Sequence, residues 1–337
     1  MAARAELAGW LESIWYGGAP VPLVLGLLEP VYASLLRLRR WSYATGLRRI
    51  GHVGVPVAVV GNLTVGGTGK TPLVAALAAE LARRAWRPGI VLRGYGGRRH
   101  APMLVGRDTD PAQCGDEAVL LARSVDLPVA VGRRRAAAAT LLVERSECDV
   151  IVSDDGLQHW GLARDVEIAV VDGQRRFGNG RLLPAGPLRE PRARLGAVDF
   201  VVANGDAQTG EVGMRVSGTQ ACSLVRPGKV VALESLRGQR VHAVAGIGHP
   251  ARFFDLLRGF GIEVIPHALP DHHVYDGGEL RFDDNRPVLV TEKDAVKCAR
   301  WADELVWVVP VEAQLPAEWY DRVHARLHQI RLQGPTA

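Results

Sequence analysis

Cysteine is scarce in this chain of 337 residues, which contains only four of them. No two of them stand at the short spacing that a metal-binding pair requires, and their wide separation favours free thiols over a disulfide framework. We therefore expect a protein of a reducing compartment that depends on an ordinary packed core. The four residues are Cys114, Cys148, Cys222 and Cys298.

Long apolar runs are also missing. The strongest stretch near the N-terminus, Pro20–Leu28, is interrupted by Pro22 and is far shorter than the roughly 20 residues that span a bilayer. It lacks the leading basic region and the cleavage site of a signal peptide. The expected location is therefore the cytosol or the cytosolic face of a membrane.

Signatures of nucleic-acid binding are absent, although the chain is basic. The formal net charge is +5 and the isoelectric point is near 9.2, which favours an anionic partner without identifying it. Anionic lipids and phosphorylated small molecules both remain possible partners. Because no aromatic-plus-basic RNA-binding motif occurs, we predict that nucleic acid is not a partner.

The most informative stretch present is Val57–Thr71, which combines a β-branched run with a glycine-rich loop. A helical pattern follows from Leu73 to Arg84. Strand, glycine loop, Lys-Thr and helix in this order are typical of a phosphate-binding loop, in which backbone N–H groups and the helix N-terminus face an anion. Lys70 would then reach the outer phosphates and the Thr71 hydroxyl would ligate Mg²⁺.

The match to G-x-x-x-x-G-K-[ST] is imperfect. Thr64 stands where the first glycine would be, and Val65 occupies the position at which a related ATPase loop has lysine. The alternative is a glycine-rich turn without a ligand, which the strand and helix context disfavours. The residues predicted to bind the nucleotide here are Thr64, Val65, Gly66, Gly67, Thr68, Gly69, Lys70 and Thr71.

A second apolar strand, Asp149–Ser153, ends in Asp154 and Asp155. An aspartate at the end of such a strand is what the second nucleotide motif requires, because its carboxylate holds Mg²⁺ opposite the loop threonine. Gln158 and His159 follow closely. This acidic pair is difficult to explain by structure alone.

Several other polar clusters leave alternatives open. Arg93 precedes glycines at the end of a strand, where α/β sheets bind ligands, but a flexible turn explains it equally well. Asp116 and Glu117 open a helix and could simply cap it. The arginines at 133–135 form either a solvated face or an anion clamp, and the histidines at 272–273 form an isolated pair without an evident third metal ligand.

Residues 1–50 differ in character from the rest, with tryptophans and apolar residues at helical spacing followed by arginines. This pattern suits helices that lie in a membrane interface. The alternative is a helical pair packed on the core, and both can hold at once because a helix has two faces.

The pattern of strands and helices predicts an α/β protein with two domains. We expect a P-loop NTPase-type αβα sandwich with a second, smaller α/β domain and N-terminal membrane-contacting helices. The expected segments are a helical segment at 1–50, a P-loop core at 51–204, a linker or β-ribbon at 205–238 and a smaller domain at 239–337.

Taken together, the motifs closely resemble one family, the tetraacyldisaccharide 4′-kinases, which act in lipid A biosynthesis in Gram-negative bacteria. The matching segments occur in the family's order and span most of the chain: GNLTVGGTGKTP (61–72), RGYGG (93–97), GDE (115–117), DDGLQH (154–159), RLLPAGPLREP (181–191), AGIGHPARFF (245–254), DHH (271–273) and TEKDAVK (291–297). The resemblance implies transfer of the ATP γ-phosphoryl group to the 4′-hydroxyl of an acylated glucosamine disaccharide 1-phosphate, giving lipid IVA.

The resemblance also implies roles for single residues. Asp116 would be the catalytic base, paired with His272, and Asp271 could fix the imidazole tautomer. Ala118 stands where the family commonly has proline, which alters helix entry rather than chemistry. The further implied residues are Lys70, Arg93 and Arg189 for phosphate stabilisation, Thr71, Asp154, Asp155 and Glu190 as candidate Mg²⁺ ligands, and Gln158 and His159 in support of the nucleotide or metal.

An enzyme with a lipid-anchored substrate must work at a bilayer surface, so the resemblance implies a peripheral protein on the cytoplasmic face of the inner membrane, in contact with anionic headgroups. One alternative is a P-loop kinase acting on a soluble small metabolite. A second is a regulatory GTPase, because the segment at 291–294 superficially resembles a guanine-reading motif, although Glu292 occupies the lysine position.

Overall fold

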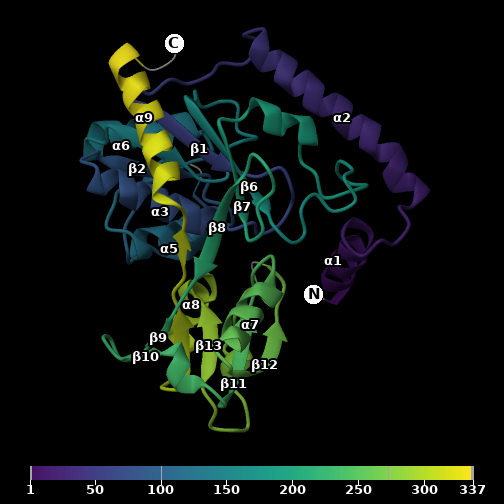
Figure 1. Cartoon of the computed structure of the whole chain (residues 1–337), viewed down its shortest axis with the longest axis vertical. Helices are drawn as coiled ribbons and strands as arrows, with labels where there is room; N and C mark the ends of the chain where they lie inside the picture. Colours follow the sequence, from purple (N-terminus) through teal and green to yellow (C-terminus); the bar gives the residue numbers. More distant parts are fainter. Residues whose placement is uncertain (1, 100, 272, 335–337) are drawn as a thin grey trace.

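The computed structural model describes residues 2–99, 101–271 and 273–334, which form two α/β lobes and an N-terminal pair of helices (Figure 1). The first lobe is built on a nine-stranded sheet in the order β15-β8-β7-β6-β1-β5-β2-β4-β3. Only its edge strands β3 and β15 run antiparallel to their neighbours. The strands are β1 (Val57–Gly61), β2 (Pro88–Leu92), β3 (Met103–Val105), β4 (Val129–Val131), β5 (Val150–Ser153), β6 (Val166–Asp172), β7 (Phe200–Asn204), β8 (Val212–Ser217) and β15 (Glu312–Gln314).

Both faces of this sheet are covered, which explains why its strands are continuous apolar runs. On one face β1 packs with α3, α5 and α9 through residues such as Leu73, Leu121 and Trp319. On the other face α6 and loop residues that include Leu157 complete the core. The helices are α3 (Lys70–Arg83), α4 (Pro111–Cys114), α5 (Asp116–Ser124), α6 (Arg135–Ser146) and α9 (Ala317–Gln333), with a 3₁₀ turn at η1 (Arg192–Ala197).

The second lobe contains a six-stranded sheet in the order β10-β9-β14-β13-β11-β12. Its central strands are parallel, and β9 and β10 add an antiparallel edge. Helices α7 and α8 pack on it with separate apolar clusters. The elements are β9 (Gln220–Ser223), β10 (Val230–Ala232), β11 (Arg240–Ala245), α7 (Pro250–Gly259), β12 (Glu263–Ala268), β13 (Val288–Thr291), α8 (Glu292–Cys298) and β14 (Val306–Val309), with 3₁₀ turns η2 (Leu233–Leu236), η3 (Gly278–Leu280) and η4 (Ala299–Trp301).

The chain passes between the lobes twice, so the lobes do not follow the segment boundaries expected from sequence. Within the expected linker at 205–238, β8 joins the first sheet while β9 and β10 join the second. After β14 the chain returns, and β15 and α9 complete the first lobe. Below, the first lobe means residues 51–217 and 312–334, and the second lobe means residues 220–309.

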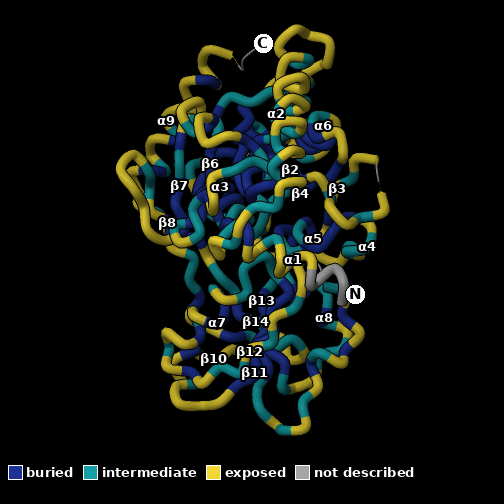
Figure 2. Tube along the Cα trace, turned by 90° about the vertical axis from the view of Figure 1, so that its right-hand side faces the viewer, coloured by how far each residue is buried: buried dark blue, intermediate teal, exposed yellow. Residues whose placement is uncertain are grey.

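The N-terminal helices α1 (Ala2–Trp15) and α2 (Leu23–Ala44) lie beside the first lobe, with α2 as a long helix on its outside (Figure 1). No residue of α2 is buried, whereas the interiors of both lobes are (Figure 2). No helix in the described part of the chain is both long and apolar enough to cross a membrane. The α/β class and the parallel sheets expected from sequence are confirmed.

Candidate active site

The glycine loop between β1 and α3 places the first turn of α3 at the floor of a large cavity. Helix α3 begins at Lys70, three positions before the expected start at Leu73, because the Lys-Thr pair is itself helical. Gly69 caps the helix with a φ of 89°, a left-handed conformation that favours glycine. The N-terminus of α3 therefore points into the cavity and offers positive charge to an anion.

Residues on either side of the glycines hold the loop in place. The backbone N–H of Val65 donates to the Pro187 carbonyl at 2.8 Å, and Thr64 forms an isolated bridge with Leu188. The Asn204 side chain at the end of β7 donates to the Thr68 carbonyl at 3.1 Å. The amide of Val65 is thus already used, which leaves the glycines and the start of α3 as the anion-facing part of the predicted nucleotide residues.

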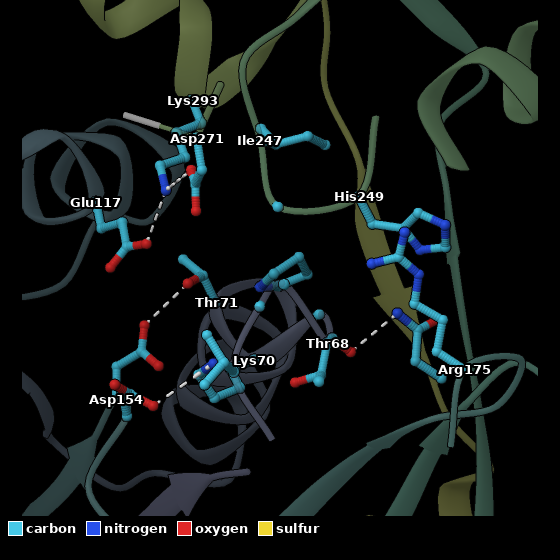
Figure 3. A pocket seen from close by; sticks show the side chains of 18 of the residues that line it. Thr68, Lys70, Thr71, Glu117, Asp154, Arg175, Ile247, His249, Asp271 and Lys293 are labelled. Atoms are coloured by element: carbon cyan, nitrogen blue, oxygen red, sulfur yellow. Dashed lines mark hydrogen bonds and ion pairs between the residues drawn. The ribbon is translucent and has the colours of Figure 1, made fainter. Parts of the chain in front are cut away.

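Thr71 and Asp154 face each other at the ends of neighbouring elements, as the two motifs predict (Figure 3). The Thr71 hydroxyl donates to Asp154 Oδ2 at 2.9 Å. The other carboxylate oxygen, Asp154 Oδ1, is buried and accepts no hydrogen bond from the described residues. A hydroxyl and a carboxylate with a spare buried oxygen suit a hard divalent cation.

Asp155 has a different environment from that of its neighbour. Lys70 Nζ lies 3.5 Å from its carboxylate, and Arg189 Nη1 lies 3.1 Å from both of its oxygens. Burial raises the pKa of Asp155, but the charges of Lys70, Arg189 and Arg135 outweigh it and lower the pKa below its usual value. For Asp154, burial and then the nearby Glu117 carboxylate raise the pKa. The two adjacent acids are therefore not equivalent.

Arg135, one of the three arginines whose role was left open, belongs to this site. Its side chain is 3% exposed, and Nη2 donates to the backbone carbonyls of Asp154 at 3.0 Å and Asp155 at 2.8 Å. Burial lowers the pKa of Arg135 to about 10, with Asp155 and Asp154 opposing that change. Arg135 therefore holds the turn at Asp154 and Asp155 in place through their carbonyl groups. In the sequence, the arginine triplet at 133–135 was the only signal for this role.

Glu190 and Gln158 form an adjoining cluster. Gln158 Nε2 donates to Glu190 Oε1 and to the Asn62 carbonyl, each at 2.9 Å, and Arg194 lies 3.5 Å from Glu190. Burial raises the pKa of Glu190. Among the described residues no three His, Cys, Asp or Glu side chains converge as metal ligands, so Glu190 does not join the aspartate pair in one ligand set here.

His159 follows Gln158 in the chain and also lines the cavity. Burial lowers the pKa of His159 to about 3, and Arg135, Arg164, Arg39 and Arg93 lower it further. The imidazole is therefore neutral at physiological pH. Arg93 is exposed on the cavity wall together with arginines of α2, where a negatively charged ligand would meet it.

Asp116 is the first residue of α5 and stands between Gly115 and Glu117, which line the cavity, although Asp116 itself is not among the lining residues. Its Oδ1 accepts the Glu117 backbone N–H at 3.0 Å, while the N-cap of the helix is Gly115 and carries no side-chain cap. The side chain is 8% exposed, which keeps the second oxygen in a largely dry position. His272, the predicted partner of Asp116, lies outside the described residues. The neighbouring Asp271 accepts from Lys293 Nζ at 3.1 Å.

The second lobe reaches the phosphate loop through residues 246–252. A Cβ on Gly248 would lie 2.6 Å from the Gly67 nitrogen, so this approach requires glycine. Beside it, Arg252 donates to Asp172 at 2.7 Å, and His249 Nδ1 lies 3.6 Å from the same carboxylate. The residues at 245–254 stood out as a motif, but their contact with the phosphate loop was not foreseen.

Most of the groups described above, though not Asp116, Asp172 and Arg194, line one cavity of about 2320 Å³ that also reaches α1 and α2. Figure 3 shows Lys70, Thr71 and Asp154 at its floor, Glu117, Lys293 and Asp271 together on one side, and His249 on the other. The cavity is larger than the few hundred to one thousand Å³ of a typical small-ligand pocket. It has room for a nucleotide and a second large ligand.

A parallel α/β sheet with this loop and a Thr71–Asp154 pair defines a P-loop site of the kind that carries out phosphoryl transfer. The family is identified by sequence: the profile described as LpxK, Tetraacyldisaccharide-1-P 4′-kinase, matches residues 21–328. The chain belongs to this tetraacyldisaccharide 4′-kinase family.

Relatives and a solved structure agree with this assignment. The chain is 50% identical over 331 residues to the tetraacyldisaccharide 4′-kinase of Xanthomonas euvesicatoria pv. vesicatoria, covering 94% of this chain and 95% of the relative. For the tetraacyldisaccharide 4′-kinase of Stenotrophomonas maltophilia the identity is 48% over 334 residues, covering 94% and 96%. The crystal structure of LpxK from Aquifex aeolicus in complex with ATP aligns with a TM-score of 0.75 at 28% identity, covering 90% of this chain and 97% of that one.

Proposed function

We propose that this protein transfers the γ-phosphoryl group of ATP to the 4′-hydroxyl of an acylated glucosamine disaccharide 1-phosphate, giving lipid IVA at the cytoplasmic face of the inner membrane. The observation that carries the proposal is one cavity that joins the phosphate loop, the aspartates at 154–155, the start of α5 and the arginines of α2, a helix that also exposes an apolar side. Family membership supports the same reaction.

The nucleotide half of the reaction depends on Lys70 and the start of α3. Lys70 and the backbone amides of the glycine loop bind the outer phosphates of ATP, because the helix N-terminus and the ammonium both favour negative charge. Arg189 and Asp155 hold Lys70 within this network through the contacts described above. Arg93 and Arg189 supply further positive charge to the transferring group.

The donor set around Thr71 and Asp154 fits Mg²⁺. The buried and unpaired Oδ1 of Asp154 supports this assignment, as does the hydroxyl beside it. When bound, a divalent cation neutralises the charge of the outer phosphates. The side chains of Lys70 and Arg189 already pair with Asp155. Glu190 is already in contact with Gln158 and Arg194. We therefore assign Thr71 and Asp154 as the protein ligands of the metal ion.

The acceptor half depends on Asp116. We assign its carboxylate as the base that takes the proton of the 4′-hydroxyl while the hydroxyl oxygen forms a bond to the γ-phosphorus. The bond between the γ-phosphorus and the bridging oxygen breaks, and ADP leaves with the electron pair. His272 is proposed to orient this carboxylate, and the resemblance to the family supports that role.

Helix α2 supports a membrane surface as the place of the reaction. One side is held to the first lobe: Glu29 pairs with Arg181 at 2.7 Å, and the Tyr32 hydroxyl donates to the Arg189 carbonyl at 3.0 Å. The other side exposes a stripe of large apolar residues, a feature that marks an interaction site in a monomer. The stripe consists of Leu23, Val24, Leu27, Leu28, Val31, Leu35, Leu38 and Trp41.

The arginines in the second half of α2 suit anionic headgroups or the 1-phosphate of the acceptor. Arg37, Arg39 and Arg40 are exposed and line the cavity, while the stripe residues of the same helix lie outside it. A lipid held by its acyl chains against α2 would therefore present its sugar to the cavity. We infer peripheral attachment through α2 on this basis.

The test is transfer of ³²P from [γ-³²P]ATP to purified disaccharide 1-phosphate lipid in mixed micelles. We expect a labelled lipid that migrates as the bisphosphorylated product, with ATP preferred over GTP. Labelling of a soluble sugar phosphate in place of the lipid would contradict the proposal, as would failure of the full chain to float with vesicles of anionic phospholipid.

A further inference from the structure

Lys293 connects the two lobes at the acceptor side of the cavity. It is the second residue of α8, and its Nζ lies 3.0 Å from Glu117 Oε1 of α5 and 3.1 Å from Asp271 Oδ1. Figure 3 shows the ammonium between the two carboxylates. Glu117 belongs to the first lobe and Asp271 to the second, so one side chain joins both lobes directly beside Asp116.

The charge of Lys293 is maintained by its surroundings. Burial lowers the pKa of Lys293, but Glu117, Asp271 and Asp116 outweigh burial and raise the pKa above its ordinary value. The ammonium therefore stays protonated and balances several carboxylates. Without it, Glu117 and Asp271 would repel each other across the lobe boundary, because like charges at close range are unfavourable.

The helix that carries Lys293 is firmly held. Asp294 is fully buried and accepts from the Thr291 hydroxyl at 2.6 Å and the Gly246 backbone N–H at 2.9 Å. Val296 packs into the core of the first lobe, and Glu292 accepts the Val311 backbone N–H at 3.0 Å. The backbone of Lys293 is therefore fixed in place, so that its side chain can position Glu117 and Asp271.

We propose that Lys293 is a positioning residue that holds the Asp271 segment of the second lobe against the first turn of α5, and thereby orients the Asp116 carboxylate toward the acceptor hydroxyl. This inference rests on the proposed function, in which Asp116 is the base. Lys293 acts through its neighbours and does not touch the reacting atoms. If Lys293 only joined the two lobes, its loss would lower the stability of the protein but would not lower kcat.

The kinetic test compares Lys293→Met, Lys293→Arg and the control Lys229→Met, which changes an exposed lysine of the same lobe. We expect Lys293→Met to lower kcat about tenfold to a hundredfold, because a small misplacement of a catalytic group has costs of this size. KM for ATP should stay within about twofold, since the phosphate loop is intact. Lys293→Arg should recover most of the rate, and Lys229→Met should match the wild type.

A double variant tests the charge argument. In a Glu117→Gln background, Lys293→Met should cost less in kcat than in the wild type, because the repulsion with Asp271 is gone. Equal losses in both backgrounds would contradict the proposal. Wild-type kcat in Lys293→Met would also overturn it, as would failure of Lys293→Arg to recover any rate, because a structural contact alone would then explain the loss.

Hydrogen–deuterium exchange gives a readout that does not depend on activity. Peptides that cover residues 111–124 and 263–276 should exchange faster in Lys293→Met than in the wild type, and not in Lys229→Met. Unchanged exchange would overturn the positioning role. If the wild type failed to phosphorylate the lipid, the proposed function would fail, while the exchange experiment would still decide the role of Lys293.

Discussion

On the nucleotide side of the cavity, the charged side chains of Lys70, Asp155 and Arg189 pair with one another, whereas the outer face of α2 exposes a continuous row of large apolar side chains. In the first arrangement each charged group finds its partner within the chain. The second leaves apolar surface in contact with water, which is unfavourable unless another apolar surface covers it.

The difference shows how the two halves are organised. The nucleotide side holds its groups in place before any ligand arrives: Arg135 holds the aspartate turn, and Asn204 holds the glycine loop. Such preorganisation lowers the cost of stabilising charge during phosphoryl transfer. The acceptor side provides a surface on which acyl chains are expected to lie. We therefore expect that substitutions can impair the nucleotide side without affecting the acceptor side, and the reverse.

The largest effect is expected at Asp116, the proposed base at the start of α5. We predict that Asp116→Ala lowers kcat by about 10²–10⁴-fold, the usual contribution of a general base. Binding of ATP and flotation with vesicles should both survive, because neither surface is changed. The measurement is single-turnover ³²P transfer beside equilibrium binding of a fluorescent ATP analogue.

The isosteric Asp116→Asn variant and the exposed-site control Asp126→Ala complete this experiment. Asp116→Asn should behave like Asp116→Ala, since it keeps the shape but loses the basic oxygen, and Asp126→Ala should be fully active. Turnover at the wild-type level in Asp116→Asn would refute the assignment of the base.

The next effect concerns the nucleotide side alone. Lys70→Ala should lower the rate by about 10²–10³-fold and weaken ATP binding as well, because the ammonium contacts phosphate in both the ground state and the transition state. Vesicle flotation should not change. The same kinetic and flotation assays with Lys229→Ala provide the control, and a Lys70→Ala protein with normal ATP affinity would speak against the loop as the nucleotide site.

The membrane-facing side is tested by Leu27→Gln combined with Leu35→Gln. Each leucine is at least 60% exposed, so the fold should tolerate the change. Loss of about 1.5 kcal/mol of burial in lipid for each side chain should weaken vesicle binding about a hundredfold in total. We expect KM for the lipid to rise while KM for ATP stays constant.

The matched control replaces two exposed apolar residues of the second lobe, Val225→Gln and Val230→Gln. These changes should leave both KM values and flotation unaffected. If the control pair reduced flotation as much as the α2 pair, binding to vesicles would reflect general hydrophobicity, and the separation between the two sides of the cavity would not hold.

The smallest effect concerns the contact between Asp172 and Arg252 beside the phosphate loop. Burial raises the pKa of Asp172, but His249, backbone N–H groups and Arg252 outweigh it, so the pKa lies below its ordinary value. A carboxylate of this kind contributes stability at pH values above its unfolded pKa of about 3.9, and this contribution is lost as pH falls through the folded pKa.

Asp172→Asn should therefore lower the Tm at pH 7 by about 2–4 °C. The difference from the wild type should shrink as the pH falls from about 4 through the lower folded pKa of Asp172, because the unfolded carboxyl is protonated first and the folded carboxylate becomes neutral only below its own pKa. Thermal unfolding followed by circular dichroism at several pH values measures both effects. A difference that stays constant down to pH 3 would show that shape rather than charge stabilises this contact.

Local patterns in the sequence were sufficient for the main elements of the first lobe. The β-branched run at Val57–Val60, the glycines and the Lys-Thr pair predicted β1, the loop and α3, and the strand ending at Asp154 predicted its position beside Thr71. These predictions succeed because strand, turn and cap signals act between residues close in the chain. The family resemblance supplied the reaction, which those signals alone did not specify.

Contacts between distant segments were decided only by the tertiary structure. Residue type could not show whether Arg135 was solvated, and no local pattern predicted that Asn204 holds Thr68 or that Lys293 meets Glu117. The return of β15 and α9 to the first lobe was equally hidden, because an amphipathic helix does not specify which core it covers. The sequence by itself determined which chemical groups are available, and the packing of remote segments decided which of them meet.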